Sequence, residues 1–361
     1  MKILVLVNDD TVTYNFKKEL LSEMIKRGNE VYLSLPCGER TKNIEALGCR
    51  IIQTPVDRRG VNPVTDCKLM LKYKKIIESV KPDKILTLTV KPNIYGGIVA
   101  KRKRIPYYTQ ITGLGSAFHQ RGFVNAVVKK LYKAALKKSN AVFFENNANM
   151  RIMLDKNIIT SEQSVLTSGA GVNLKEYNYF PMTEQKANRL IFIGRLMKEK
   201  GIGELLEAVE RLNMDKRSFS IDLYGRVEEE EYLDEVKKLE KAGNFRYFGD
   251  VVDLPDRLRN YGAVILPSYH EGMSNALLEA ASSGLAVICS DIPGCCETVV
   301  DGVSGYICEA QNADSLYKAI CKYLDSSYMQ KSEMSLAGRR HMEKTFDRTK
   351  VVEETLRIME L

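Results

Sequence analysis

Two carboxylates flank a short turn in the segment PSYHEGMSNALLEAASSG, residues 267–284. Glu271 precedes the Gly-Met-Ser-Asn turn and Glu279 follows it. Ser274 and Asn275 favour a helix start, because their side chains can cap free backbone N–H groups. We therefore expect Glu271 in a loop and Glu279 in the first or second turn of a helix. Since N–H groups at a helix start attract anions, the pattern suits a phosphate with a polyhydroxyl group on each side, one for each carboxylate.

A cluster of cations lies earlier in the same half of the chain. The segment IFIGRLMKEKGI places Arg195 and Lys200 shortly after an apolar run that is typical of a buried strand. A guanidinium can bind a phosphate through two parallel hydrogen bonds, and an ammonium acts as a mobile point charge. Both cations could reach one diphosphate. Alone they could be ordinary surface residues, but their occurrence with Glu271 and Glu279 favours a diphosphate site.

Strands and helices must hold these candidate site residues in position. Short apolar runs alternate with helical segments of about 10 to 15 residues in the first half of the chain, and the alternation restarts near residue 187. This pattern predicts the α/β class, with one doubly wound parallel sheet in each half and ligands beyond the carboxyl ends of the strands. The predicted strands are 2–8, 30–36, 50–56, 84–90, 106–112, 187–196, 219–225, 245–251, 262–267 and 285–290. The predicted helices are 14–28, 42–47, 67–82, 94–104, 125–140, 204–213, 232–243, 254–262 and 276–281.

Length and composition limit the classes of protein that the chain can represent. Its 361 residues exceed the usual size of one core, and a hydrophobic content of 44% suffices for two. We expect domains at residues 1–176 and 187–344, with a final helix at 345–361 that packs back on the first. No apolar run is long enough to span a membrane, and the opening MKILVLVNDD becomes acidic too soon for a signal peptide. A cytoplasmic protein is expected.

The two halves differ in charge. Residues 1–170 contain 29 Lys and Arg against 14 Asp and Glu, a net charge of +15, whereas residues 171–361 contain 25 against 32, a net charge of −7. A basic half suits nucleic acid, an anionic membrane surface or a phosphorylated substrate, or it simply carries solvated lysines.

The cysteines and histidines indicate neither a metal site nor disulfides. The chain has eight cysteines and three histidines, and no C-x-x-C spacing occurs among them. We expect reduced thiols and no metal cofactor.

The segments GRLMKEKG, YFGDV and PSYHEGMSNALLEAASSG, in this order, resemble the donor-side motifs of retaining family 4 glycosyltransferases. The resemblance spans nearly the whole chain and implies the GT-B fold, in which two Rossmann-like domains face each other across a cleft. It implies that Glu271 contacts donor-sugar hydroxyls and Glu279 the ribose, while Arg195 and Lys200 contact the diphosphate. It also implies that the backbone of Gly272, Met273, Ser274 and Asn275 contacts the sugar and phosphates, and that residues 248–251, including Val251, border the nucleobase.

Two further segments, ITGLGSAFHQRGF (111–123) and TYNF (13–16), are similar to bacterial enzymes that extend sugars on undecaprenyl diphosphate, particularly N-acetylgalactosaminyltransferases and capsular or exopolysaccharide glycosyltransferases. Many family members have a histidine before the glycine of this loop, whereas Thr112 precedes Gly113 here, which weakens the case for a histidine-assisted step. Gly113 serves either close approach to a ligand or an ordinary turn, and His119 is either structural or a substrate contact. By this resemblance the acceptor side comprises Tyr14, Asn15, Thr112, Gly113 and His119.

Two basic features suit a lipid-linked acceptor. The predicted helix at 125–140 carries apolar residues beside five lysines, and such a helix can rest on anionic headgroups at about 1 kcal/mol per cation. Alternatively, its apolar face packs on the core and the lysines are solvated. Lys91, directly after a predicted strand, is a candidate ligand of the acceptor diphosphate. We expect peripheral association with the inner face of the cell membrane. The five lysines are Lys129, Lys130, Lys133, Lys137 and Lys138.

Together these observations predict a retaining, metal-independent transfer of a hexose or N-acetylhexosamine from a UDP-sugar to a lipid-linked glycan in surface polysaccharide assembly. Arg195 and Lys200 would stabilise the charge on the leaving diphosphate. The resemblance implies a front-face reaction that needs no protein nucleophile. One alternative is a nucleotide-sugar epimerase of the same fold, which needs acid and base groups around the sugar, where only Glu271 is well placed. Another is a nucleic-acid-binding module, but the basic half lacks a reading motif and aromatic platforms.

Overall fold

The computed structural model describes residues 1–57, 62–114, 118, 123–241, 243–251 and 254–361. The chain folds into two compact units. Unit 1 comprises Met1–Ala170 and Thr349–Leu361, and unit 2 comprises Gly171–Arg348. The chain therefore passes between the units twice, whereas the predicted first domain ends at residue 176 and the predicted final helix begins at residue 345.

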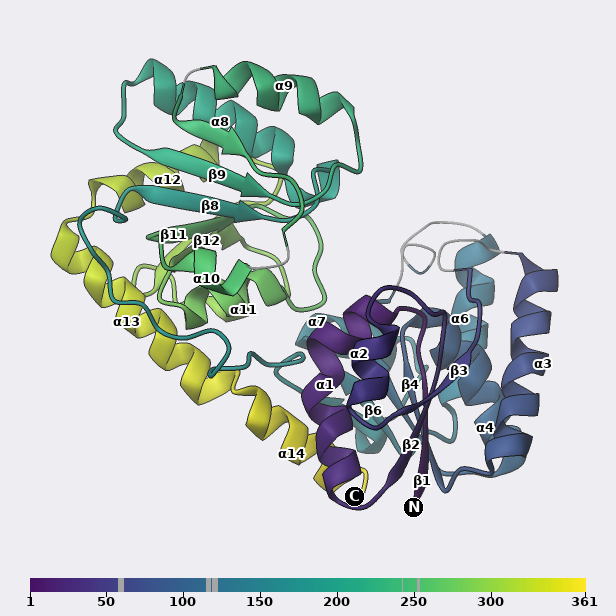
Figure 1. Ribbon diagram of the computed structural model, residues 1–361. Helices are drawn as coiled ribbons and strands as arrows, with labels where there is room; N and C mark the ends of the chain where they lie inside the picture. The colour runs from purple at the N-terminus through teal and green to yellow at the C-terminus, as the bar shows by residue number, and fades with distance from the viewer. Residues whose placement is uncertain (58–61, 115–117, 119–122, 242, 252–253) are drawn as a thin grey trace. The chain divides into compact units, whose positions relative to one another are not determined.

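Unit 1 is built on a seven-stranded parallel sheet of order β3-β2-β1-β4-β5-β6-β7 (Figure 1). The chain adds β2 and β3 on one side of β1 and then returns to add β4 on the other side. This reversal is the topological switch point of a doubly wound sheet. The strands are β1 (Lys2–Leu6), β2 (Glu30–Leu35), β3 (Arg50–Gln53), β4 (Lys84–Leu88), β5 (Tyr107–Ile111), β6 (Ala141–Phe144) and β7 (Ser164–Leu166).

Helices cover both faces of the unit 1 sheet, as the alternation of side chains along a strand requires. In β1, Ile3 and Val5 belong to one hydrophobic cluster, and Leu4 and Leu6 to another. Figure 1 shows α1, α2 and α14 on one face and α3, α4 and α6 on the other. The helices are α1 (Asp10–Lys26), α2 (Thr41–Ala46), α3 (Pro63–Val80), the π-helix η1 (Pro92–Gly96), α4 (Gly97–Lys103), α6 (Phe123–Leu136), α7 (Asn147–Asp155), the 3₁₀ turn η2 (Ser161–Gln163) and α14 (Arg348–Ile358).

The last residues of the chain complete the core of unit 1. Val352, Leu356 and Met359 are buried in the same cluster as Ile3 and Val5. At the surface, Arg27, the residue that follows α1, forms an ion pair with Glu353, with 2.6 Å between Nη2 and Oε2.

Unit 2 repeats the doubly wound topology with six parallel strands of order β10-β9-β8-β11-β12-β13. Its switch point lies between β8 and β11. The two sheets confirm the predicted fold class. The strands are β8 (Arg189–Ile193), β9 (Ser220–Tyr224), β10 (Phe245–Tyr247), β11 (Ala263–Leu266), β12 (Ala286–Ser290) and β13 (Gly305–Cys308).

One hydrophobic cluster fills unit 2 on both sides of its sheet. Figure 1 shows α8, α9 and α12 on one face and α10, α11 and α13 on the other. The helices are η3 (Lys198–Lys200), α8 (Ile202–Met214), α9 (Glu231–Glu240), α10 (Leu254–Leu258), α11 (Asn275–Ser282), η4 (Cys296–Thr298), α12 (Ala313–Asp325) and α13 (Tyr328–Thr345).

Predicted and observed helix bounds differ by a few residues in several places, and two of these differences have a clear local cause. The helix predicted at 94–104 is preceded by the π-helical turn at Pro92–Gly96, and its α-helical part begins only at Gly97. The helix predicted at 254–262 ends at Leu258, because the N–H of Gly262 donates to the carbonyl of Arg189 and directs the chain into β11. Among the described helices, none combines the length and the apolar composition that crossing a bilayer demands.

Candidate active site

The loops that follow β8 and β11 leave the unit 2 sheet at its switch point. Adjacent parallel strands whose connections run in opposite directions leave a crevice at their carboxyl ends. The loop after β8, residues 194–201, carries Arg195 and Lys200, and the loop after β11, residues 267–274, carries Glu271. The topology therefore brings predicted site residues from two distant segments to one edge of the sheet.

Lys200 and Glu271 contact each other across this crevice. The distance from Lys200 Nζ to Glu271 Oε1 is 2.5 Å, and the two side chains are 18% and 14% exposed. The hydroxyl of Ser268 donates to the same carboxylate oxygen at 2.9 Å. The structure thus joins one predicted phosphate ligand to the predicted sugar ligand.

Close backbone contact fixes the two loops to each other. Gly201 has a φ of +70°, and a Cβ at this position would lie 2.1 Å from the carbonyl oxygen of Pro267. The N–H of Tyr269 donates to the carbonyl of Glu199 at 2.9 Å. The Tyr269 hydroxyl donates to Glu204 Oε1 at 2.5 Å, and burial together with this hydrogen bond raises the pKa of the tyrosine. Only glycine fits at position 201 without moving the loops apart.

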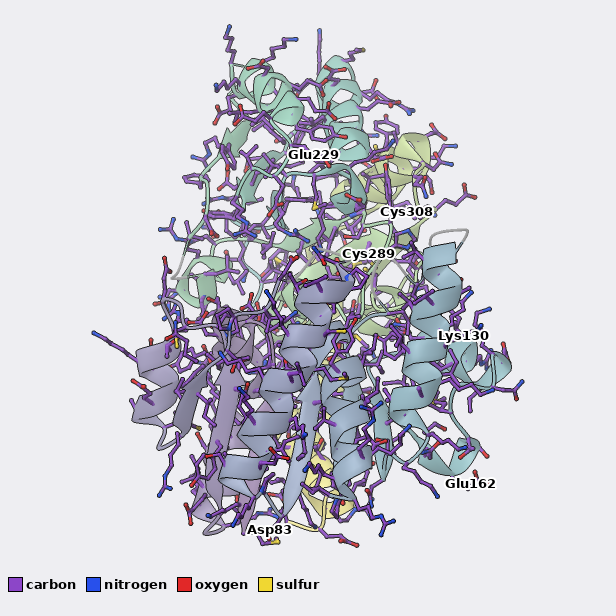
Figure 2. The ribbon with its side chains drawn as sticks, turned by 90° about the vertical axis from the view of Figure 1, so that its right-hand side faces the viewer. Asp83, Lys130, Glu162, Glu229, Cys289 and Cys308 are labelled. Atoms are coloured by element: carbon purple, nitrogen blue, oxygen red, sulfur yellow. The ribbon has the colours of Figure 1, made fainter. Side chains whose placement is uncertain are left out.

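A third loop, which follows β9, supports the loop after β8. The N–H of Lys198 donates to Glu229 Oε2 at 2.9 Å, and Glu229 is labelled in Figure 2. The N–H groups of Glu228 and Glu229 both donate to the carbonyl of Leu196 at 3.1 Å. These contacts hold the backbone around Lys200 from the side of β9, whereas the loop of Glu271 contacts it from the side of β11.

The start of α11 presents backbone N–H groups at the same edge. Ser274 is the N-cap residue, but its side chain makes no capping hydrogen bond. The N–H of Ser274 donates to the carbonyl of Gly294 at 2.8 Å, and a Cβ on Gly294 would lie 2.5 Å from the carbonyl oxygen of Gly272. Met273 is buried, which anchors the turn. The first N–H groups of a helix, beginning here with Asn275, have no acceptor within the helix, so this turn can accept an anion.

Glu279 lies in the second turn of α11 and is 9% exposed. Its neighbour is Tyr177, whose hydroxyl hydrogen-bonds to the carboxylate. Burial and the negative charge of Glu279 raise the pKa of Tyr177, while Arg348 lowers it. Tyr177 was missed in the sequence analysis, because it lies about a hundred residues before Glu279 and outside every motif.

Arg195 does not join Lys200 and Glu271. Its Nη1 lies 3.5 Å from Glu228 Oε1, and its side chain is 39% exposed. Arg226 approaches the same oxygen more closely, at 2.8 Å. If Arg195 and Lys200 are to bind one diphosphate, as predicted, the Arg195 side chain must move away from Glu228. The sequence pattern did not indicate Glu228 as a partner of Arg195.

The predicted border of the nucleobase carries a stacked aromatic pair. The rings of Tyr224 and Phe248 lie 4.9 Å apart at an angle of 8°, and Phe248 is 42% exposed. The N–H of Gly225 donates to the carbonyl of Gly249 at 2.8 Å, which fixes the loop, and Val251 is half-buried. An exposed face of Phe248 offers an apolar surface for a planar ring.

The predicted acceptor residues lie after β1 and β5 in unit 1. Tyr14 and Asn15 belong to α1; Tyr14 is half-buried, with Lys18 Nζ 5.6 Å from its ring centroid, and Asn15 is exposed. Thr112 and Gly113 follow β5 and are half-buried. Both positions lie at the carboxyl edge of the sheet, where ligands of such folds bind. His119 lies outside the described residues.

Lys91, which follows β4, has a buried partner. Its Nζ lies 2.7 Å from Asp66 Oδ1, and both residues are 8% exposed. The hydroxyl of Tyr95 donates to the other oxygen of Asp66 at 2.8 Å. An open hollow of about 490 Å³ adjoins this pair and is also lined by Lys68 and Lys72. Asp57 and Asp66 line the same hollow, so the candidate ligand of the acceptor diphosphate is one of three lysines beside two acids.

A buried carboxylate at the same edge of unit 1 was missed. Glu145 directly follows β6 and is 7% exposed. Burial raises its pKa, while Lys17 and a 3.3 Å hydrogen bond from Gln110 Nε2 counteract the shift. The sequence signal was an acid directly after the apolar run AVFF.

Within the described part of the chain, no three His, Cys, Asp or Glu side chains are grouped so that they could hold a metal ion. The eight cysteines are free thiols. Figure 2 labels Cys289 and Cys308, on the neighbouring strands β12 and β13; the Cys308 thiol donates to the Cys289 carbonyl at 3.4 Å.

Comparison with known proteins gives consistent matches over both units. The family described as "Glycosyl transferases group 1" matches residues 180–341, and the family described as "Glycosyl transferase 4-like" matches residues 2–146. The chain is 28% identical over 331 residues, 86% of each chain, to the N,N'-diacetylbacillosaminyl-diphospho-undecaprenol alpha-1,3-N-acetylgalactosaminyltransferase of Campylobacter jejuni.

Two further similarities extend this result. The UDP-Gal:alpha-D-GlcNAc-diphosphoundecaprenol alpha-1,3-galactosyltransferase of Escherichia coli is 25% identical, over 78% of this chain and 76% of the enzyme. The crystal structure of Anabaena HepE in complex with UDP and glucose superposes with a TM-score of 0.80 at 15% identity and covers 100% of this chain and 99% of that one. At this identity the structural match shows the fold alone.

Proposed function

Because the chain belongs to the GT-B glycosyltransferases with a group 1 domain and a 4-like domain, we propose that it is a retaining hexosyltransferase. It moves a hexose or N-acetylhexosamine from a UDP-sugar to a glycan on undecaprenyl diphosphate, in surface polysaccharide assembly. The observation that carries this proposal is the contact between Lys200 and Glu271 beside the start of α11. It combines a cation, a carboxylate and free N–H groups, which are the groups needed for a sugar diphosphate.

In this proposal, the donor diphosphate lies between the N–H groups of the α11 start and Lys200. Arg195 joins them by exchanging Glu228 for a phosphate oxygen. Glu271 accepts hydrogen bonds from the donor-sugar hydroxyls, and Glu279 from the ribose. Charge builds up on the diphosphate as the glycosidic bond breaks, and preorganised cations and N–H groups stabilise that charge.

The acceptor hydroxyl attacks the anomeric carbon from the face that the diphosphate leaves, and it passes its proton to the departing phosphate oxygen. The new bond therefore has the same configuration as the old one. No protein nucleophile takes part, and the reaction uses no metal ion because Lys200 and Arg195 supply the positive charge.

Two observations support a lipid-linked acceptor. Two relatives have names that include sugars on diphosphoundecaprenol, and unit 1 carries the predicted acceptor residues. Tyr14, Asn15, Thr112 and Gly113 line the carboxyl edge near the acceptor glycan. Lys91 lies beside a hollow with two further lysines, which suits the acceptor diphosphate.

Association with the membrane surface is proposed for α6. Its exposed side includes Val124, Val127, Lys130 and Lys133, and Figure 2 marks Lys130. Apolar residues beside lysines suit the interface of an anionic bilayer. Flotation with anionic vesicles that is lost at high salt and reduced by Lys130→Gln/Lys133→Gln would support this; a parent protein that ignores anionic lipid would contradict it.

The decisive experiment is an assay of UDP release from a panel of UDP-sugars, with and without undecaprenyl-diphosphate-linked sugars and with a metal chelator present. We expect UDP only when donor and acceptor are both present, together with an α-linked product from an α-linked donor. An epimerase would instead convert the donor without any acceptor. Product of inverted configuration, or loss of activity with chelator, would contradict the proposal.

A further inference from the structure

A second open hollow lies at the amino edge of the unit 1 sheet, away from the carboxyl edge that carries the predicted acceptor residues. It has a volume of about 670 Å³ and is bounded by the ends of α4 and α6 and by the start of β5. Asp83, which precedes β4, marks this edge in Figure 2.

Four cations line this hollow, and its lining contains no acidic residue. Lys101 donates to the carbonyl of Ala134. Arg104, Lys137 and Lys138 have no acidic partner in the described part of the chain. Four positive charges therefore surround one open space, with no counter-charge among the residues that line it.

The four cations repel one another around one open space, although water screens part of this repulsion because Arg104, Lys137 and Lys138 are exposed. Burial and the charges of Lys137 and Arg102 lower the pKa of Lys101. Cations are favoured near helix C-termini. Lys101 gains this stabilisation through its hydrogen bond to the carbonyl of Ala134, near the end of α6. One carbonyl does not neutralise four cations, so an anion in the hollow would relieve the repulsion.

Buried contacts hold the lining in place. The hydroxyl of Tyr107 donates to the carbonyl of Ala135 at 2.5 Å and accepts from the N–H of Lys138 at 3.2 Å. The N–H of Tyr107 donates to Asn140 Oδ1 at 3.2 Å. Gly97 lets α4 approach α6, since a Cβ there would lie 3.3 Å from the Ala135 carbonyl. A lining that is already ordered loses little entropy when it binds a ligand.

We propose that this hollow is a binding site for a phosphate group, either on a lipid headgroup or on a small soluble molecule. Arg104 supplies the planar guanidinium that binds two phosphate oxygens, and the lysines supply point charges. Its residues are not among those of the proposed donor and acceptor sites, whereas Lys137 and Lys138 belong to the five lysines expected to face anionic headgroups.

The test compares two variants that remove the same charge from one region. Arg104→Gln/Lys138→Gln removes two exposed cations that line the hollow. Arg102→Gln/Lys103→Gln removes two cations from the same segment that do not line it, and Lys103 already pairs with Glu78 at 2.5 Å. The probes are glycerol phosphate, followed by amide NMR shifts, and vesicles of phosphatidylglycerol in phosphatidylcholine, followed by flotation.

We expect the lining variant to bind at least about tenfold more weakly than the parent, the scale of losing two cations near a phosphate, and the control variant to stay within about twofold. Loss confined to vesicles identifies a lipid headgroup as the source, and loss with glycerol phosphate identifies a soluble phosphate. Equal loss in both variants, or a parent that binds neither probe, overturns the proposal. Unchanged UDP affinity and melting temperature in both variants show that the fold is intact.

Discussion

Lys200 and Glu271 form an ion pair of 2.5 Å between residues 71 positions apart in the chain. Each side chain comes from a different loop at the switch point of unit 2, so the pair depends on the sheet order and not on local sequence. Because removing one partner of a partly buried pair leaves the other unpaired, substitutions at either position alter the electrostatics of both.

Replacing Lys200 should impair chemistry. We expect Lys200→Ala to lower turnover by roughly 10- to 1000-fold, because it removes a charge that stabilises the leaving diphosphate. Lys198→Ala, an exposed lysine in the same turn, is the matched control and should retain most of the activity. Near-normal turnover of Lys200→Ala in the UDP-release assay would contradict the assignment.

Arg195 should also be needed for turnover, although the structure pairs it with Glu228. We expect Arg195→Ala to reduce turnover by about tenfold or more, since in the proposed mechanism its guanidinium binds the diphosphate of the donor. Arg226→Ala removes the other arginine from Glu228 and should have a small effect. If both variants lose activity equally, Arg195 acts only by organising the loop.

Substitutions of Glu279 and Glu271 should have different effects on UDP affinity. Glu279→Gln should weaken UDP by about tenfold or more, the cost of losing a hydrogen bond to a charged group, because Glu279 is assigned to the ribose. Glu271→Gln should change UDP affinity much less than Glu279→Gln does, because Glu271 meets UDP only through its partner Lys200, and it should lower the rate of sugar transfer. Calorimetry with UDP and with the intact donor distinguishes these effects, and an equal loss of UDP affinity would refute the division.

The backbone at Gly201 should be intolerant of a side chain. Gly201→Ala places a Cβ 2.1 Å from the Pro267 carbonyl, so the loops must separate and the contact of Lys200 with Glu271 must be lost. Gly302 has a similar φ of +72° but open space around its Cβ position, which makes Gly302→Ala the control for backbone strain alone. We expect the control to melt about 2–4 °C lower with normal turnover. Gly201→Ala should melt lower still and be nearly inactive.

A buried lysine gives unit 2 a pH-dependent stability. Lys186 is 4% exposed, and burial lowers its pKa to about 8. Below pH 8 both folded and unfolded chains hold the proton, so the folded state bears the full cost of the buried charge. Between pH 8 and about 10.4 the unfolded chain binds more protons, and stability rises with pH.

Lys186→Met should therefore stabilise the protein at pH 7, by at most about 3 kcal/mol, and the gain should shrink towards pH 10. Urea unfolding of parent and variant at both pH values measures it. The exposed Lys241→Met is the control. A gain that is constant or grows with pH would show that the charge of Lys186 is not the cause.

The alternation of apolar runs was sufficient to predict most strands of both sheets, because buried parallel strands are short continuous apolar segments. Strand β6, inside the unit 1 sheet, and the edge strands β7 and β13 were missed. Ser164–Leu166 has only three residues, and Gly305–Cys308 contains a glycine at its start, so neither stands out from a loop. The π-turn at Pro92–Gly96 depends on packing that a periodic pattern does not contain.

The motif residues of unit 2 could be found from sequence, since Glu271, Glu279 and the α11 start lie within one segment. Their partners could not. Tyr177, Glu228 and Asp66 come from other elements, and their contacts with Glu279, Arg195 and Lys91 exist only once the sheet order is set. Residue type alone does not tell whether a cation already has a counter-ion, because the counter-ion is known only from the three-dimensional structure.

The path of the chain through the two units bears on how the protein is made. Unit 2 is continuous, whereas unit 1 is closed by Thr349–Leu361, whose Val352, Leu356 and Met359 fill its core. During translation, domains fold as their residues emerge from the ribosome. Unit 2 can therefore fold as soon as its own residues have emerged, while the segment Met1–Ala170, although synthesised first, keeps an unfilled apolar surface until the last helix is released. That nascent intermediate is the stage at which chaperone binding or aggregation would act on this chain.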